Sequence, residues 1–360
     1  MFVGVFCKEK LMRDVGIGVV GLGRLGLVHA QNIVKRVKNG RLVAVCDMNE
    51  ELARATAEEL GGRWYTEIED MLEDRDIDAV CIVTPTAYHV EPIEKTVEAG
   101  KPFFCEKPLA SNLEDTVYLA GLIEDSGLLC QIGFNRRFDP EYMRAKEIID
   151  SGEIGKPVYY EGISRDPFPP PLWACDPAKG GGLFIDMLLH DFDLARFLMG
   201  DEVDSVFANE TNLVIDGGDI NRFADNVTAT LRFKGGALGN CHASMHAEYG
   251  YDIRHEVYGE RGRIIVDTTS RLNVSLASRE GGVCKPYTYH REDNIPHFMF
   301  RFGESYANEM GVFVDTVLNG GESLVTARDA LEAFRISLAA VESAGRHELI
   351  RLGETKKGLG

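Results

Sequence analysis

Hydrophobic and polar positions follow two different patterns along the chain. From Val15 to about Phe134, short apolar runs alternate with segments whose apolar residues recur at helical spacing. Strands and helices in alternation predict a parallel sheet with both faces covered. The expected strands are 16–20, 42–46, 78–84, 102–105 and 128–134, and the expected helices are 26–37, 50–60, 90–99 and 113–126.

The second pattern follows a predicted helix over residues 139–151. Beyond Gly155, apolar and polar residues alternate in short runs between glycine-containing turns such as Lys234-Gly235-Gly236, which is typical of an antiparallel sheet. The expected strands are 157–164, 227–233, 237–244, 252–258, 263–267 and 272–277, and the closing helices are 305–318 and 327–343. We therefore expect an α/β fold, with a doubly wound parallel sheet over residues 15–135 and an α+β domain with a large, mostly antiparallel open sheet over residues 136–360.

Composition narrows the classes of partner. The 360 residues are 44% apolar, and 39 basic against 57 acidic residues give a net charge of −18, which disfavours nucleic acid and anionic membrane surfaces. No apolar run approaches the ~20 residues that a membrane span needs. The eight cysteines form no Cys-x-x-Cys pair, and we interpret residues 1–14 as a short extension without the features of a secretion signal. These observations predict free thiols in a reducing cytoplasm.

A glycine motif predicts a dinucleotide site. Gly21, Gly23 and Gly26 form a Gly-x-Gly-x-x-Gly sequence, with Arg24 and Leu25 inside it, which follows an apolar strand and opens a helix. This context is the fingerprint of a Rossmann-type domain, in which the backbone approaches a pyrophosphate at the helix N-terminus. Asp47 ends the next strand, where a carboxylate accepts hydrogen bonds from the adenosine ribose and repels a 2′-phosphate. We therefore expect NAD as the cofactor.

Asp186 and His190 form a candidate acid/base pair. They lie four residues apart in a stretch with helical spacing, so both side chains are expected on one helix face. A neighbouring carboxylate favours the protonated imidazole and orients it, which suits a histidine that removes a hydroxyl proton. Together with a dinucleotide, the pair indicates hydride transfer from an alcohol.

Two other interpretations of this pair remain open. The first is a solvated or structural pair on an amphipathic helix. The second is a metal site, since His190-Asp191 with Asp186 and Asp193 is similar to the His-Asp clusters of metal-dependent phosphohydrolases. Such sites recruit more histidines from helices, whereas the other histidines here lie mostly in predicted loops or strands, so we expect no metal.

The segment Cys105-Glu106-Lys107-Pro108 ends a predicted parallel strand. It stands between the glycine motif and a Gly-Gly-x-x-x-Asp-x-x-x-His sequence that begins at Gly181. In this arrangement the chain resembles the glucose–fructose oxidoreductase and inositol dehydrogenase family from Val15 onward. Three further segments are similar to its bacterial inositol 2-dehydrogenase branch, namely Gly133-Phe134-Asn135-Arg136-Arg137-Phe138-Asp139, Ser164-Arg165-Asp166-Pro167-Phe168-Pro169-Pro170-Pro171 and Tyr249-Gly250-Tyr251-Asp252.

The resemblance assigns roles to particular residues. It implies that Lys107, Asp186 and His190 are catalytic and contact the substrate, and that the Lys107-Pro108 peptide is cis. It also implies that the loop over residues 84–89 lies beside the nicotinamide and its ribose, and that further residues contact the substrate. The implied cofactor residues are Thr84, Pro85, His89, Glu106 and Lys107, and the further substrate residues are Arg137, Asp166 and Tyr251. Two simpler readings remain open, in which Arg137 pairs with Asp139 and Tyr251 is an ordinary strand aromatic.

The resemblance implies an NAD-dependent dehydrogenase that oxidises a ring hydroxyl of myo-inositol to the ketone. Alternatives are a dehydrogenase of scyllo-inositol, another inositol isomer or a pyranose sugar, a nucleotide-binding regulator without catalysis, and a metal-dependent hydrolase. The segment 173–179 departs from many inositol dehydrogenases, so the identity of the polyol is less secure than the reaction. The family also implies a homotetramer built on the open sheet, and strands 227–233 and 237–244 carry the alternating apolar residues that one layer of helices would bury.

Overall fold

The computed structural model describes residues 14–168, 181–216, 223–267, 274–278, 295 and 297–353. The extension over residues 1–13 and the segment 173–179 lie outside the described residues, as do residues 272 and 273 of the last predicted strand. The chain forms two compact units, which are described separately here. The first contains the described residues up to Cys105 together with Ser126–Gln131 and Ala307–Ser323, and the second contains Glu106–Asp125, Ile132–Tyr306 and the residues from Leu324 onward.

The first unit is built on a six-stranded sheet with the order β3-β2-β1-β4-β5-β6. The register of β1 against β2 and β4 is parallel, as are the pairings of β2 with β3 and of β4 with β5. The strands are β1 (Val15–Val20), β2 (Gly40–Cys46), β3 (Arg63–Tyr65), β4 (Ala79–Ile82), β5 (Phe103–Glu106) and β6 (Cys130–Gly133).

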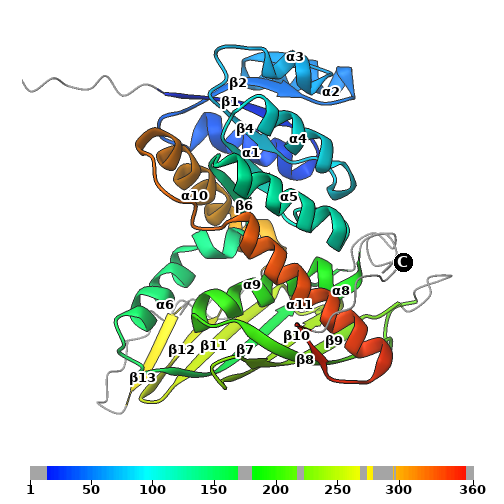
Figure 1. Cartoon of the computed structure of the whole chain (residues 1–360), viewed down its shortest axis with the longest axis vertical. Coiled ribbons are helices and arrows are strands. Elements are labelled where there is room, and N and C mark those ends of the chain that lie inside the picture. Colours follow the sequence, from blue (N-terminus) through cyan, green and yellow to red (C-terminus); the bar gives the residue numbers. More distant parts are fainter. Residues whose placement is uncertain are drawn as a thin grey trace, which may run out of the picture. The chain divides into compact units, whose positions relative to one another are not determined.

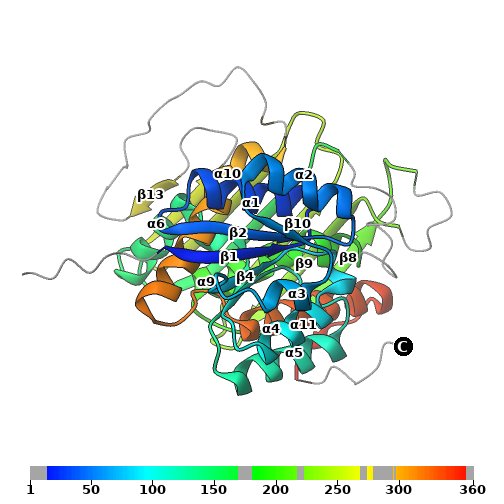
Figure 2. The ribbon, with the colours of Figure 1, turned by 90° about the horizontal axis from the view of Figure 1, so that it is seen from above.

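Helices cover both faces of this sheet, which explains why its central strands are apolar on both sides. Figure 2 shows α1 and α2 on one side of β1 and β2, with α3 and α4 on the other. All six residues of β1 are buried. The helices after these strands are α1 (Arg24–Lys35), α2 (Glu50–Leu60), α3 (Ile68–Leu72), the short 3₁₀ helix η1 (Thr86–Tyr88) and α4 (Val90–Glu98). The next helix in the chain, α5 (Leu113–Ser126), belongs to the second unit up to Asp125.

The second unit is built on an eight-stranded sheet with the order β13-β12-β11-β7-β10-β9-β8-β14 (Figure 1). Only the β7–β10 pairing is parallel among the pairs described. The strands are β7 (Pro157–Arg165), β8 (Val203–Thr211), β9 (Asn226–Phe233), β10 (Leu238–Ser244), β11 (Asp252–Gly259), β12 (Gly262–Asp267), β13 (Val274–Ser278) and β14 (Ile350–Arg351).

One face of this sheet carries the helices, which pack on β7 to β10 and on β12 (Figure 1). Along β9 the apolar residues Val227, Ala229, Leu231 and Phe233 are buried, and the residues between them are exposed, as the period-two pattern predicts. The helical segments are the 3₁₀ helix η2 (Asn135–Phe138), α6 (Pro140–Asp150), α8 (Gly182–Asp186), α9 (Leu188–Met199), α10 (Phe298–Asn319) and α11 (Ala327–Arg346).

The predicted fold class is confirmed, with differences in several elements. The sequence pattern did not predict β3, α3, β8 or β14, and α10 begins seven residues before the predicted 305. The residues of α10 from Ala307 onward belong to the first unit, whereas the prediction placed all residues after 135 in the second domain. The domain boundary itself stays a prediction.

Candidate active site

The three glycines of the motif have different surroundings in the first unit. Gly21 has a φ of +89°, and a Cβ there would lie 2.7 Å from the Val83 carbonyl oxygen, while a Cβ on Gly26 would lie 1.9 Å from the Gly21 oxygen. A Cβ on Gly23 would meet nothing within 4 Å. Two glycines therefore let the turn and helix α1 pack closely, and Gly23 leaves open space beside the turn for a ligand.

The start of α1 suits an anionic ligand. The helix is capped by the Gly23 backbone without a side-chain hydrogen bond, and its first turn contains no acidic residue. The positive end of the helix dipole therefore favours a phosphate group at this position. The residues present fit the pyrophosphate of a dinucleotide, and contacts from Arg24 and Leu25 stay predictions.

Asp47 follows β2 and lies against the glycine turn. Its Oδ2 accepts a 2.8 Å hydrogen bond from the Leu22 N–H, and its Oδ1 accepts one of 2.9 Å from the Asn49 N–H. The carboxylate is thus fixed beside the turn and is only partly buried. This is the position from which a carboxylate binds the ribose hydroxyls of an adenosine.

The loop after β4 is held by a buried histidine. The His89 ring is 1% exposed, and its Nε2 lies 2.8 Å from the Thr84 carbonyl oxygen. His89 thus fixes the backbone of Thr84. Thr84, Pro85 and His89 stay predicted cofactor residues.

Lys107 and Asp186 lie together in the second unit. The Lys107-Pro108 peptide is cis. The Lys107 Nζ donates a 3.1 Å hydrogen bond to the Asp186 carbonyl oxygen and lies 3.8 Å from the carboxylate Oδ1. The side chain of Asp186 is 45% exposed, so it is accessible to a small molecule.

The structure contradicts the expected single helix through Asp186 and His190. Asp186 is the last residue of α8, Met187 interrupts the helix with φ −101° and ψ −58°, and His190 lies in the first turn of α9. The two side chains therefore do not project from adjacent turns of one helix, and Asp186 approaches Lys107 instead of orienting the imidazole.

The His190 ring is neutral in this environment. Burial lowers the pKa of His190 well below its usual value, and the charges of Lys107 and Arg136 lower it further. Its Nδ1 is enclosed without a hydrogen-bond partner among the described residues, which leaves Nε2 as the nitrogen available to a substrate. The expectation that Asp186 would favour the protonated ring is wrong. A neutral imidazole can accept a proton directly, so the role of a base is still supported.

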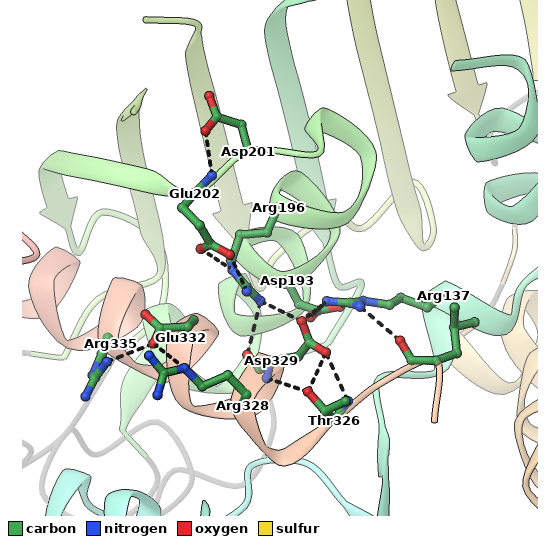
Figure 3. Close-up of polar contacts among 11 residues, drawn as sticks. Arg137, Asp193, Arg196, Asp201, Glu202, Thr326, Arg328, Asp329, Glu332 and Arg335 are labelled. Atoms are coloured by element: carbon green, nitrogen blue, oxygen red, sulfur yellow. Dashed lines mark hydrogen bonds and ion pairs between the residues drawn. The ribbon is translucent and has the colours of Figure 1, made fainter. Parts of the chain in front are cut away.

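Arg137 is held by buried carboxylates. Its side chain is 6% exposed, and the guanidinium donates to both carboxylate oxygens of Asp193, at 2.9 and 2.6 Å, and to the Asp329 Oδ1 at 3.0 Å (Figure 3). A further N–H donates to the Leu324 carbonyl oxygen at 3.2 Å. These contacts use most of its hydrogen-bonding capacity, and its contact with a substrate stays a prediction. The alternative pairing with Asp139 is wrong, because Asp139 accepts from Arg301.

Asp166 and Tyr251 stay predicted substrate residues. Asp166 follows β7, and its backbone is fixed by hydrogen bonds with Ser244 and Ala247, both 2.9 Å long. Burial raises the pKa of Tyr251, and the charge of Asp166 raises it further, which places the two side chains near one another. Glu106 likewise stays a prediction, and its carboxylate accepts a 3.2 Å hydrogen bond from the Lys107 N–H.

A buried polar group next to His190 was not predicted. Asp191 is 0% exposed and is bonded by Arg136, Ser164 and His255. The sequence held one signal for it, since Asp191 and Asp193 lie among the apolar residues of this helix, and two consecutive arginines, Arg136 and Arg137, occur earlier in the chain. Buried carboxylates in such a helix require cationic partners.

A dinucleotide turn in one unit and a lysine, aspartate and histidine group in the other define a nicotinamide-dependent oxidoreductase. Two family models match the chain: "Oxidoreductase family, NAD-binding Rossmann fold" over residues 15–134, and "GFO/IDH/MocA C-terminal domain" over residues 142–265. The chain therefore belongs to the GFO/IDH/MocA family of oxidoreductases, and its cofactor is NAD.

Similar proteins cover almost the whole chain. A scyllo-inositol 2-dehydrogenase (NAD(+)) of Bacillus subtilis is 40% identical over 92% of this chain and 94% of that protein. A myo-inositol 2-dehydrogenase of Thermotoga maritima is 38% identical over 94% of this chain and 98% of that protein. The crystal structure of scyllo-inositol dehydrogenase from Lactobacillus casei with bound NAD(H) and scyllo-inositol matches with a TM-score of 0.82 and 30% identity, over 95% of this chain and 100% of that chain.

Proposed function

We propose that the protein is an NAD-dependent inositol 2-dehydrogenase that oxidises a ring hydroxyl of myo-inositol to the ketone. The observation that carries the proposal is the group formed by Lys107, Asp186 and a neutral His190, on a chain whose relatives are inositol 2-dehydrogenases. A regulator that only binds a nucleotide has no need of this group. A metal-dependent hydrolase is not supported by the family.

The proposed reaction uses each member of the group differently. NAD supplies the acceptor for the hydride that leaves the carbinol carbon. His190 accepts the hydroxyl proton through Nε2, and the Lys107 ammonium donates a hydrogen bond to the reacting oxygen and stabilises its developing negative charge. The exposed carboxylate of Asp186 fixes the ammonium and accepts a hydrogen bond from a neighbouring ring hydroxyl.

The decisive experiment is a panel of inositols and pyranose sugars, assayed by NADH absorbance. We expect the highest kcat/KM for myo-inositol. Relatives with similar identity are named for myo- and for scyllo-inositol, so a preference for scyllo-inositol or a sugar would select the alternative substrate within the family. If no polyol or sugar supported NADH formation, the proposed activity would be refuted.

The position of Asp47 leads to a prediction about the cofactor. Because the carboxylate is fixed beside the glycine turn, it should repel a 2′-phosphate, and kcat/KM for NAD should exceed that for NADP at least about tenfold, or roughly 1.4 kcal/mol. Asp47→Asn should lower the ratio of kcat/KM for NAD to kcat/KM for NADP. Equal use of both cofactors by the unaltered enzyme would contradict the assignment.

We also propose that the protein is a homotetramer, or at least a dimer, which pairs through the open face of the eight-stranded sheet. This face exposes neutral side chains, including Thr228 and Thr230 of β9, and large apolar ones, including Phe207, Leu238 and Tyr258, with Arg232 as a charged exception on β9. A face of this composition favours an interface over a solvated surface.

Light scattering coupled to size exclusion tests this assembly. We expect a mass of two or four times 39.9 kDa at micromolar concentration, and dissociation when Thr230→Glu places a charge on the face. A monomer would refute the assembly, and an unchanged mass for the variant would place the interface elsewhere.

We further propose a cytoplasmic location. The five cysteines within the described part of the chain are all buried and form no disulfide with one another, which suits a reducing compartment. Separately, the described residues contain no helix long and apolar enough to cross a membrane.

A further inference from the structure

His190 and Asp191 are neighbours in the first turn of α9, but their surroundings differ. His190 touches the edge of Phe134, with ring centroids 5.9 Å apart, and its Nδ1 has no hydrogen-bond partner among the described residues. The Asp191 carboxylate accepts hydrogen bonds from the Ser164 hydroxyl at 2.7 Å and from the His255 Nε2 at 2.8 Å, and lies 3.1 Å from an Arg136 nitrogen. His190, which is the proposed base, thus has few polar contacts, whereas the carboxylate of Asp191 has several.

Three separate elements converge on Asp191. Ser164 belongs to β7, His255 to β11 and Arg136 to η2. The sheet is shaped to admit the carboxylate, because a Cβ at Gly162 of β7 would lie only 3.1 Å from its Oδ1. The Tyr160 hydroxyl also donates to the Asp191 carbonyl oxygen at 3.2 Å. Asp191 therefore fastens the start of α9 to the sheet and to η2.

The start of α9 has few other polar contacts among the described residues, and its apolar residues Leu188 and Leu189 are fully buried. Its N-cap, Met187, makes no side-chain hydrogen bond, and the chain turns at this residue out of α8. The His190 N–H bonds only the Met187 carbonyl oxygen, at 3.2 Å. Asp186, on the other side of the break, contacts Lys107. The attachment of Asp191 is thus the polar contact that, together with the burial of Leu188 and Leu189, fixes where the backbone of His190 lies.

We propose that Asp191, held by Arg136, Ser164 and His255, is the positioning residue for His190. Its negative charge also partly offsets the electrostatic effect of the buried Arg136 on the imidazole. The inference rests on the proposed function, because it takes His190 as the proton acceptor.

Electrostatics support the second part of this role. The charged groups around the Lys107–His190 group include Lys107, Glu106 at the end of β5, Asp186 at the end of α8, Arg136 on η2 and Asp191 on α9. Burial raises the pKa of Asp191, but Arg136, His255 and Ser164 together hold it below its usual value, so the carboxylate stays ionised.

His255 completes the group as a neutral donor. Burial lowers its pKa. Its Nε2–H donates to Asp191, and its Nδ1 accepts a 2.5 Å hydrogen bond from the Tyr142 hydroxyl. The negative charge of Asp191 therefore balances the positive charge of Arg136. Removal of either charge should change the pKa of His190.

The two single substitutions should shift the pH profile in opposite directions. Asp191→Asn leaves Arg136 without its counter-charge, so the acid limb of kcat/KM should move to lower pH. Arg136→Met removes the positive charge that depresses the pKa of His190, so the limb should move to higher pH. Loss of the attachment should also lower kcat on the order of 10- to 100-fold in Asp191→Asn, with KM for NAD unchanged. The double variant should return the acid limb toward its original position.

The matched control is Glu202→Gln. Glu202 pairs with Arg196 at 2.7 Å and supports the other end of α9, so its loss should leave the acid limb in place. Histidine-selective NMR measures the pKa of the His190 ring without any substrate, and it should reproduce the two opposite shifts. If both substitutions moved the limb and the ring pKa in the same direction, or neither moved them, the role of Asp191 would be refuted. Failure of the proposed function would appear separately, as an unaltered enzyme that oxidises no polyol.

Discussion

Replacement of His190 by alanine should lower kcat for polyol oxidation by at least about 100-fold, because the reaction loses its proton acceptor. The ring is neutral before substrate binds, since burial and the charges of Lys107 and Arg136 hold its pKa well below the usual value. The acid limb of kcat/KM in the unaltered enzyme should therefore lie below pH ~6.5, the usual histidine pKa. Stopped-flow NADH absorbance measures both quantities.

A control separates this effect from the loss of any histidine. His347 is exposed at the C-terminal end of α11 with a φ of 55°, and asparagine tolerates this conformation, so His347→Asn should retain full kcat. The affinity of His190→Ala for NAD should also be unchanged, because the glycine turn is untouched. Near-normal turnover by His190→Ala would show that another group is the base.

Arg137→Met should destabilise the protein by about 3–5 kcal/mol, because it leaves a buried carboxylate without its partner. Asp193 is 1% exposed and receives two hydrogen bonds from Arg137. Burial already raises the pKa of Asp193, so the unpaired group would take up a proton. Urea unfolding, followed by tryptophan fluorescence, gives the loss of free energy.

A double substitution tests whether the pair acts as a unit. Arg137→Met with Asp193→Leu removes both charges, and most of the lost stability should return because no buried charge is left alone. Asp329 keeps its contact with Arg196 at 3.1 Å in this variant. If Arg137→Met were fully stable but had a greatly raised KM for the polyol, the original prediction of a substrate contact would be correct after all.

Local patterns predicted the fold well where a single stretch of sequence decides the structure. The Gly21 to Gly26 turn, the strand that ends just before Asp47 and the alternation along β9 all depend on neighbouring residues. Strand β8 was missed because small and polar residues, Ser205 and Ala208, occupy some of its buried positions and weaken the alternation of hydrophobicity.

Ion pairs between residues far apart in the sequence could not be predicted from local patterns. Arg137 was assigned to a substrate or to Asp139, but its partners Asp193 and Asp329 lie 56 and 192 residues away. Asp139 pairs with Arg301, which lies 162 residues away. No periodicity encodes which buried cation meets which carboxylate. The break in the helix at Met187 was not predicted, because apolar residues continue at helical spacing through this position.

The return of α10 to the first unit bears on how the chain folds as it is synthesised. Met310, Phe313 and Val314 complete the apolar core formed by β1, β2 and α1, and all three are 0% exposed. An N-terminal fragment that ended at residue 135 would have the strands and the glycine turn but would present the surface that these side chains cover to water. Synthesis must therefore pass Val314 before the apolar core of the nucleotide-binding unit is complete. The first strands of this unit are made early, but the unit can fold completely only late in synthesis.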